Sequence, residues 1–113
     1  PAMAEEVLRD LIGSEKIKPI TIEAVQRAVA EHFDVRIADL CGRSRQRMVA
    51  YPRQVSMYLC KMLVPSLSLN EIGSAFGGKD HTTVLHACGK ISRLAQEPKI
   101  RQVLGQLERA IRG

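Results

Sequence analysis

The sequence has no tryptophan and few other aromatic residues, namely two tyrosines and two phenylalanines. Aliphatic side chains must therefore fill most of its core, which suits packed helices better than a sandwich of sheets. No apolar run approaches the roughly 20 residues that cross a bilayer, and no signal-peptide pattern opens the chain. No stretch alternates at period two over enough residues for a strand. These absences favour an all-α protein of six or seven helices, which we expect to be cytoplasmic.

Cysteine is scarce and odd in number, because the chain holds only Cys41, Cys60 and Cys88, without C-x-x-C spacing. This pattern argues against a disulfide framework and against a zinc site. His81, His86 and Cys88 are close in sequence, but on one helix they would point in different directions. We therefore expect no metal, and we interpret Cys88 as a packing residue.

The chain of 113 residues is long enough for one domain with a modest core, and its net charge is +5. The charge is uneven: residues 1–40 are acidic on balance, whereas residues 41–95 carry eight basic and two acidic side chains. Such a balance is typical of a domain with a polyphosphate partner, although a solvated basic face is the alternative. Because the chain opens on Pro1, we expect it to be a piece of a longer protein.

The stretch between residues 68 and 95 predicts a helix, a turn and a second helix. Ser68 and Glu71 have the spacing of a capping box, so a helix begins just after Ser68. Gly77-Gly78 ends it, because glycine adopts left-handed conformations at little cost. Asp80 is then expected to cap the second helix by accepting from the N–H of Thr82 or Thr83.

The second helix is predicted to bury one face and to present a polar one. Its buried stripe is Val84, Ala87, Cys88, Ile91, Leu94 and Ala95. Two short helices joined by a glycine turn are typical of a helix-turn-helix, which places its second helix in the major groove of DNA. An ordinary helical hairpin without a DNA-binding role is the alternative. The spacing Gly73-x-x-x-x-Gly78-Lys79 also fits a phosphate loop, but Asp80 follows where that loop needs a hydroxyl.

Other segments read as scaffold helices and a basic loop. Helices are predicted at Met3–Ile12, from Thr21 to Phe33, at Ile37–Leu40, from Pro52 to before Pro65, and at Ile100–Ile111. The helix that begins at Pro52 is expected to point Val55, Leu59, Met62 and Leu63 inward. Between them, Gly42–Arg47 is a basic loop in which Arg43, Arg45 and Arg47 can follow phosphates or enter a minor groove. A solubilising loop is the alternative.

Pro52 suits the first position of its helix, because its missing N–H needs no partner there. Arg53 and Gln54 would then lie in the first turn, where side chains and free N–H groups can hold a phosphate. Lys61, near the end, either holds a phosphate or complements the helix dipole.

The segment Phe76-Gly77-Gly78-Lys79-Asp80-His81-Thr82-Thr83-Val84, with Ile72-Gly73, His86-Ala87 and Lys90-Ile91, is similar to the signature of the C-terminal DNA-binding domain of the DnaA family of bacterial replication initiators. The resemblance implies that residues 1–20 are a connector helix and linker from an AAA+ module outside this chain, and that residues 21–113 are the helix-turn-helix domain. It implies no cofactor here, because ATP and Mg²⁺ belong to the AAA+ module, and no enzymatic activity in this domain.

By the same resemblance, the domain binds an asymmetric nine-base-pair origin element of the TTATNCACA type. We expect it to bind as a monomer, because the sequence shows no heptad seam and the element is not palindromic. The residues that match base-reading positions are Arg45 in the minor groove, Lys79, Asp80, His81 and Thr82 in the major groove, and Leu69 and Asn70 near thymine methyls. Those that match phosphate-holding positions are Arg53, Gln54, Lys61, Thr83, His86 and Lys90, and the basic loop adds Arg43 and Arg47.

Two departures from the family pattern bear on affinity. Ser44 stands where the loop often carries another arginine, and Gly89 loosens the middle of the second helix. The chemistry of the site residues agrees with the resemblance, because His can donate to guanine, Asp can accept from cytosine, and a Thr methyl can pack on a thymine methyl. A helical module that docks a protein regulator of initiation is the alternative function.

Overall fold

The computed structural model describes residues 19–43 and 46–113, and these residues form six α-helices and no strand. The helices are α2 (Ile22–Phe33), α3 (Ile37–Leu40), α4 (Arg47–Leu63), α5 (Leu69–Ala75), α6 (His81–Leu94) and α7 (Pro98–Arg112). The all-α prediction is confirmed. The helix expected at Met3–Ile12 lies outside the described residues, as do Ser44 and Arg45. Among the described helices, none is long and apolar enough to cross a membrane.

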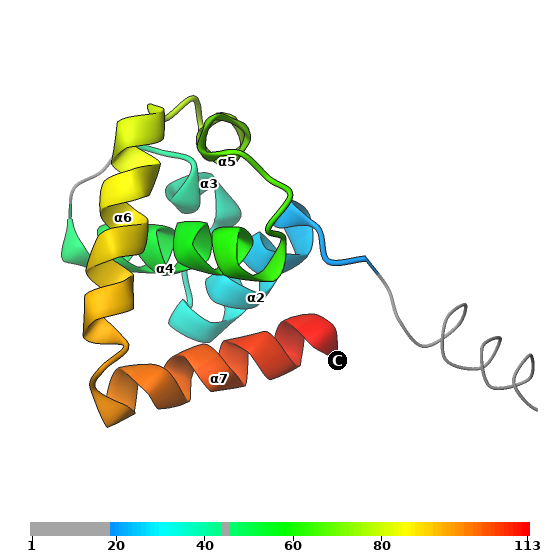
Figure 1. Cartoon of the computed structure of the whole chain (residues 1–113), viewed down its shortest axis with the longest axis vertical. Coiled ribbons are helices and arrows are strands. Elements are labelled where there is room, and N and C mark those ends of the chain that lie inside the picture. Colours follow the sequence, from blue (N-terminus) through cyan, green and yellow to red (C-terminus); the bar gives the residue numbers. More distant parts are fainter. Residues whose placement is uncertain (1–18, 44–45) are drawn as a thin grey trace, which may run out of the picture.

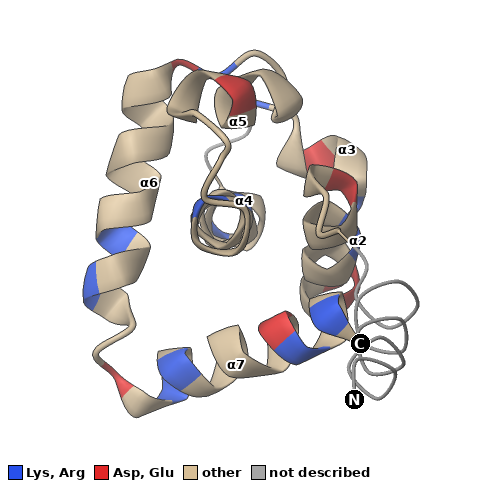
Figure 2. Cartoon of the chain, turned by 45° about the vertical axis from the view of Figure 1, so that its right-hand side comes forward, with Lys and Arg blue, Asp and Glu red and all other residues tan. Residues whose placement is uncertain are grey.

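Helix α4 is the centre of the fold. Figure 2 looks along its axis and shows α6, α5, α7 and the pair α2 and α3 arranged around it. All five of these helices contact α4. In Figure 1, α6 crosses α4 and the closing helix α7 lies below both. The elements near α4, including the turn between α5 and α6, are therefore held by one shared core.

The core forms where these helices meet α4, and its members are apolar as the composition requires. Val55 of α4, Val25 of α2 and Val84 of α6 are completely buried, and Phe76 is the largest fully buried side chain. Met62 was expected to point inward, but it is 57% exposed. That prediction is wrong because Met62 lies in the last turn of α4, next to a connection in which Pro65 and Ser66 are exposed.

The helix starts predicted from capping residues are confirmed at α2 and α5. Thr21 Oγ1 accepts a hydrogen bond from the N–H of Ala24 at 3.1 Å. Ser68 and Glu71 form a reciprocal capping box: the Glu71 N–H donates to Ser68 Oγ at 3.0 Å, and the Ser68 N–H donates to Glu71 Oε1 at 2.8 Å. The bonds from Ser68 lower the pKa of Glu71.

The predicted start of α4 is wrong. The helix begins at Arg47, and the Gln46 carbonyl accepts from the N–H of Val49 at 3.0 Å and of Ala50 at 2.8 Å. Pro52 therefore lies inside the helix, where it has no N–H to donate to the carbonyl of Met48. The helix tolerates this because Met48 lies in the first turn and is 78% exposed, so water can reach that carbonyl.

Candidate nucleic-acid interface

The turn between α5 and α6 requires glycine at three positions. Gly77 and Gly78 have φ angles of +85° and +77°, in the left-handed region that favours glycine. A Cβ on Gly73 would collide with the carbonyl oxygen of Lys79, and the Gly73 carbonyl accepts from the Lys79 N–H at 2.8 Å. Backbone therefore lies directly against backbone in this turn, which confirms the predicted helix, turn and helix.

Helix α6 buries one face and exposes the other, as predicted. Val84, Ala87 and Ile91 are buried, and Cys88 and Leu94 are half-buried beside them. The side chains on the opposite face and at the start of the helix are exposed to solvent: His81, Thr82, Thr83, His86 and Lys90. The predicted DNA contacts from α6 are thus all on its free surface.

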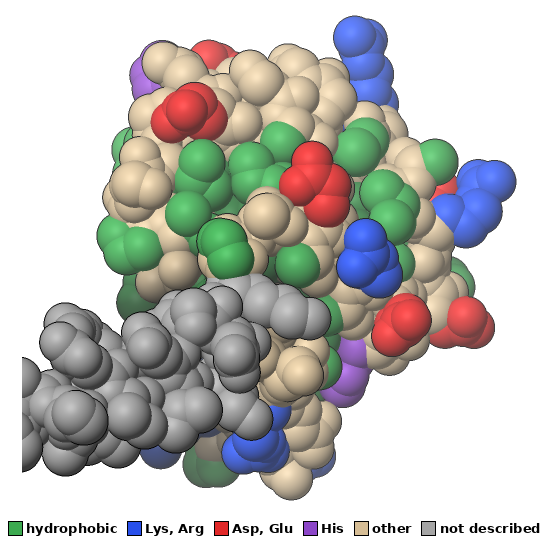
Figure 3. All heavy atoms as spheres, turned by 90° about the vertical axis from the view of Figure 1, so that its right-hand side faces the viewer, with side chains coloured by type: hydrophobic (Ala, Val, Ile, Leu, Met, Phe, Trp, Pro, Cys, Tyr) green, Lys and Arg blue, Asp and Glu red, His purple; other side chains and the backbone are tan. Residues whose placement is uncertain are grey.

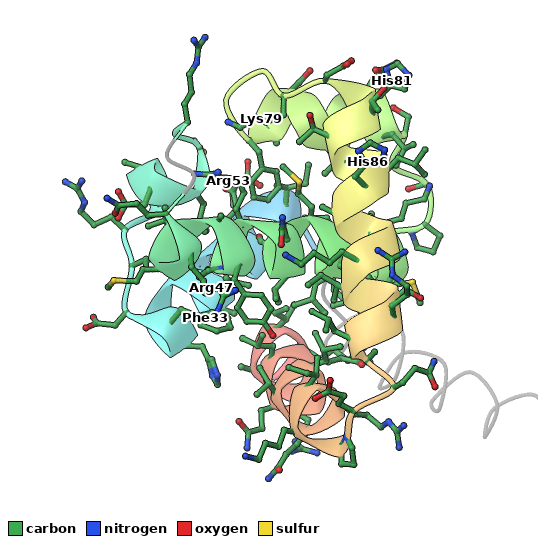
Figure 4. The ribbon with its side chains drawn as sticks, turned by 90° about the vertical axis from the view of Figure 1, so that its left-hand side faces the viewer. Phe33, Arg47, Arg53, Lys79, His81 and His86 are labelled. Carbon is green, nitrogen blue, oxygen red and sulfur yellow. The ribbon has the colours of Figure 1, made fainter. Side chains whose placement is uncertain are left out.

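Asp80 is the N-cap residue of α6, but the predicted capping bond is absent. Its side chain makes no hydrogen bond with the N–H groups of the first turn. Instead, Asp80 Oδ1 lies 3.1 Å from Nδ1 of His81, and both side chains are more than half exposed. Figure 4 shows His81 at the free end of α6. His81 is therefore not packed under the turn, and its ring and the Asp80 carboxylate face solvent as a pair.

A groove of about 1220 Å³ lies between the first half of α4, the turn after α5, and α6. Among the described residues that line it, Asp80 is the only acidic one. We call it the basic groove because five lining residues are cationic: Arg43, Arg47, Arg53, Lys79 and Lys90. The opposite face of the molecule differs, since Figure 3 shows apolar side chains with acidic and basic ones mixed among them. The groove thus has the charge that attracts a polyanion.

The basic groove also has apolar lining residues, which the sequence did not predict. Phe33, Met48, Tyr51 and Leu94 line it. The rings of Phe33 and Tyr51 meet edge to face with centroids 5.6 Å apart. The available signal was an aromatic residue just after the arginine-rich loop, but Phe33 comes from α2 and only the packing of α2 on α4 brings the two rings together.

Arg53 is placed differently from the sequence prediction. Since α4 begins at Arg47, Arg53 is not in a first turn with free N–H groups, and its side chain is only 8% exposed. Its Nε donates to the carbonyl of Leu40 at 3.0 Å, and its Nη2 donates to the carbonyl of Asp39 at 2.9 Å. The prediction that Arg53 lies in a helix first turn is therefore wrong, whereas its match to a phosphate-holding position stays a prediction. The guanidinium instead caps the C-terminus of α3.

Lys79 also turns back toward the protein. Its Nζ donates to the carbonyl of Phe76 at 2.7 Å and to the carbonyl of Cys41 at 3.4 Å. Burial lowers the pKa of Lys79, and the positive charge of Arg53 lowers it further. Figure 4 shows Arg53 and Lys79 above α4, and Arg47 and Phe33 below it.

The remaining predicted site residues are spread around the fold. Gln54 is half-buried in the basic groove, and among the described residues its Oε1 has no hydrogen-bond partner. Lys61 donates from Nζ to the carbonyl of Leu67 at 3.1 Å and so ties the end of α4 to the connection before α5. In the first turn of α5, Leu69 is half-buried and Asn70 is exposed. Only Gln54 of these lines the groove.

The three cysteines are free thiols. Burial raises the pKa of Cys60 to about 12, which keeps this thiol protonated and unreactive. Within residues 19–43 and 46–113, no group of three His, Cys, Asp or Glu side chains is placed to hold a metal ion. Gly73 lies in helix α5 rather than after a strand, so the phosphate-loop alternative lacks its structural setting.

A helix-turn-helix whose second helix exposes polar residues beside a basic groove defines a DNA-binding domain of the helix-turn-helix class. Residues 22–91 match the family described as bacterial dnaA protein helix-turn-helix. The chain belongs to this family.

A relative is the chromosomal replication initiator protein DnaA of Treponema denticola, which is 38% identical over 112 residues. The alignment covers 98% of this chain and 24% of that protein. The chain therefore spans about a quarter of the length of this relative.

Proposed function

We propose that this domain binds double-stranded DNA at nine-base-pair origin elements of the DnaA-box type, as part of the initiation of bacterial chromosome replication. In this proposal α6 enters the major groove, and the loop that begins at Gly42 reaches the adjacent minor groove. The family membership and the basic groove support it. The domain would then act on the nucleoid in the cytoplasm, with ATP chemistry left to other parts of a longer protein.

The observation that carries the proposal is the exposed first turn of α6. Asp80, His81 and Thr82 all face solvent at the helix end that a helix-turn-helix presents to base edges. Their chemistry covers three kinds of contact: a carboxylate can accept from cytosine, an imidazole N–H can donate to guanine, and a methyl group can pack on thymine. The bond from the Lys79 N–H to the Gly73 carbonyl, 2.8 Å long, ties the start of α6 to α5, and a fixed helix end favours recognition of a specific sequence.

The length of α6 fits the proposed docking. Lys90 is nine residues after His81, and a helix rises by about 1.5 Å per residue, which separates the two along the axis by roughly 13 Å. The major groove is about 12 Å wide. When His81 reaches the bases, Lys90 therefore lies near a phosphate strand, and the exposed Thr83 and His86 lie between them. Arg43 and Arg47 line the opposite side of the basic groove and would hold a second strand.

A titration tests the proposal. Fluorescence anisotropy is measured with two labelled duplexes, one that carries the nine-base-pair element and one with the same bases in scrambled order. We expect the element to bind at least about a hundredfold more tightly, because specific protein–DNA complexes exceed nonspecific ones by such factors. Sedimentation of the complex is expected to show one chain per element. Equal affinity for both duplexes would refute sequence-specific binding.

A further inference from the structure

Two helix C-termini meet beside the basic groove. Helix α3 ends at Leu40, with Cys41 as its C-cap, and α5 ends at Ala75, with Phe76 as its C-cap. They lie so close that a Cβ on Gly77 would collide with the carbonyl oxygen of Cys41. The last carbonyls of a helix lack partners within the helix and carry partial negative charge. This junction therefore requires hydrogen-bond donors, and cations suit it best.

Two cationic side chains supply those donors. Arg53 reaches from α4 and bonds the α3 side through the carbonyls of Asp39 and Leu40. Lys79 bonds both sides, because its Nζ donates to Phe76 at the end of α5 and to Cys41 at the end of α3. Gln26 of α2 adds a neutral bond, from Nε2 to the carbonyl of Ala75 at 3.0 Å. Among these bonds, only those of Lys79 involve the carbonyls of both C-cap residues.

The two segments joined by Lys79 lead directly into the two proposed DNA-contacting segments. Gly42 and Arg43 follow Cys41, and Arg43 is exposed on the rim of the basic groove. Asp80 and α6 follow Lys79 itself. A shift of Cys41 relative to Phe76 would therefore change the distance between the start of the basic loop and the recognition helix.

We propose that Lys79 is a positioning residue, which fixes Arg43 at the start of the basic loop relative to α6 by bonding the carbonyls of Cys41 and Phe76, and that it does not read a base. This inference rests on the proposed function, since both segments must contact one duplex for their spacing to matter. Arg43 adds to the binding energy only if it reaches the DNA while α6 is also bound. By fixing the distance between the two segments, Lys79 lets both contact one duplex at the same time.

The first test needs no DNA. Lys79→Met shortens the side chain by one atom and removes its three donors, and Lys90→Met makes the same change at an exposed position in the same groove. We expect Lys79→Met to lower the melting temperature by several degrees, because it leaves the Phe76 carbonyl without its donor. Lys90→Met should leave it nearly unchanged, and Lys79→Arg should restore it. An unchanged melting temperature for Lys79→Met would overturn the proposal.

The second test measures coupling to the loop. Arg43→Ala is introduced into four backgrounds: wild type, Lys79→Met, Lys79→Arg and Lys90→Met. In each background, the affinity for the nine-base-pair duplex is measured with and without Arg43→Ala. In wild type we expect Arg43→Ala to weaken binding about fivefold, the value of one typical hydrogen bond. In the Lys79→Met background the factor should fall below about twofold, whereas Lys79→Arg and Lys90→Met should keep the wild-type factor. A merely stabilising lysine would not alter this factor at a temperature where all variants are folded.

The outcomes separate this inference from the proposed function. Equal binding of wild type to element and scrambled duplex refutes the proposed function before any variant is compared. If wild type discriminates, but Arg43→Ala costs the same factor with and without Lys79, the positioning role is refuted while the function stands. Should Lys79→Met fail to fold, Lys79→Gln, which is one atom shorter and keeps a neutral donor, is read by the same two criteria.

Discussion

The substitution Gly73→Ala tests whether the close approach of α5 to the start of α6 determines both stability and DNA recognition. A Cβ at this buried position would collide with the carbonyl oxygen of Lys79, which is backbone and cannot rotate away. The turn must move to make room. That movement disturbs the bond from the Lys79 N–H to the Gly73 carbonyl, which is 2.8 Å long in the native turn.

The expected magnitude follows from three contributions. Overpacking costs about 1–3 kcal/mol, and loss of the Lys79 hydrogen bond costs about 1 kcal/mol. Alanine in a helix recovers about 0.5–1 kcal/mol relative to glycine. We therefore expect Gly73→Ala to lower the free energy of unfolding by about 1–3 kcal/mol, which corresponds to roughly 5–20 °C in melting temperature for a domain of this size.

Gly105→Ala is the matched control. Gly105 lies in α7, and nothing stands within 4 Å of the Cβ that alanine would add. It should therefore raise the melting temperature by a few degrees. At a temperature where all proteins are folded, Gly73→Ala should weaken binding to the nine-base-pair element about tenfold or more, because the displaced α6 loses base contacts. Circular dichroism melts and anisotropy titrations measure both effects. A Gly73→Ala domain as stable as the Gly105→Ala domain would refute the reasoning.

Four further predictions follow from the same geometry. His81→Ala should cost about 1–3 kcal/mol on the element alone, whereas Lys90→Ala should weaken element and scrambled duplex by similar factors; unchanged discrimination by His81→Ala would exclude His81 as a reader. The logarithm of affinity should fall against the logarithm of salt concentration with a slope of about −3 if the exposed groove cations Arg43, Arg47 and Lys90 meet phosphates, and a slope near zero would favour the protein-docking alternative. Gly89→Ala should raise the free energy of unfolding by about 0.5–1 kcal/mol, because its Cβ would meet only the tip of Arg93 at 3.7 Å; a lower melting temperature would contradict this. Because the bond from the Ser68 backbone N–H lowers the pKa of Glu71 below its ordinary 4.5, its stabilisation should be present above about pH 4.5 and be lost as pH falls through the lowered value; melts of Glu71→Gln, which removes the titrating group, should lack this pH-dependent part from pH 3 to 7.

Local features of this chain were predictable from the sequence because each depends on residues within one or two turns. The capping bonds at Thr21 and Ser68 join residues three positions apart. The left-handed Gly77 and Gly78 and the buried stripe of α6 follow from backbone sterics and helical periodicity. These features were enough to predict a helix-turn-helix.

Capping rules failed where several local patterns competed. Pro52 fits a first helical position, yet α4 starts at Arg47, because packing of α4 against five other helices outweighs the single bond that proline removes. Asp80 fits an N-cap and occupies that position, but its carboxylate pairs with the neighbouring His81 ring. From the sequence alone, the Asp80 carboxylate could bond either the N–H groups of the first turn or the His81 ring, and nothing in the sequence favours one over the other.

The sequence by itself determined the fold class, the helix-turn-helix and the exposed polar start of α6, since periodicity and turn chemistry act over short distances along the chain. Only the tertiary structure decided which groups Arg53 and Lys79 bond. Both looked like free cations for phosphate or bases, but packing brings the C-termini of α3 and α5 together between them. Partly negative carbonyls that are brought that close favour charged donors, and the number of residues between Cys41 and Gly77 gives no sign that their backbones meet.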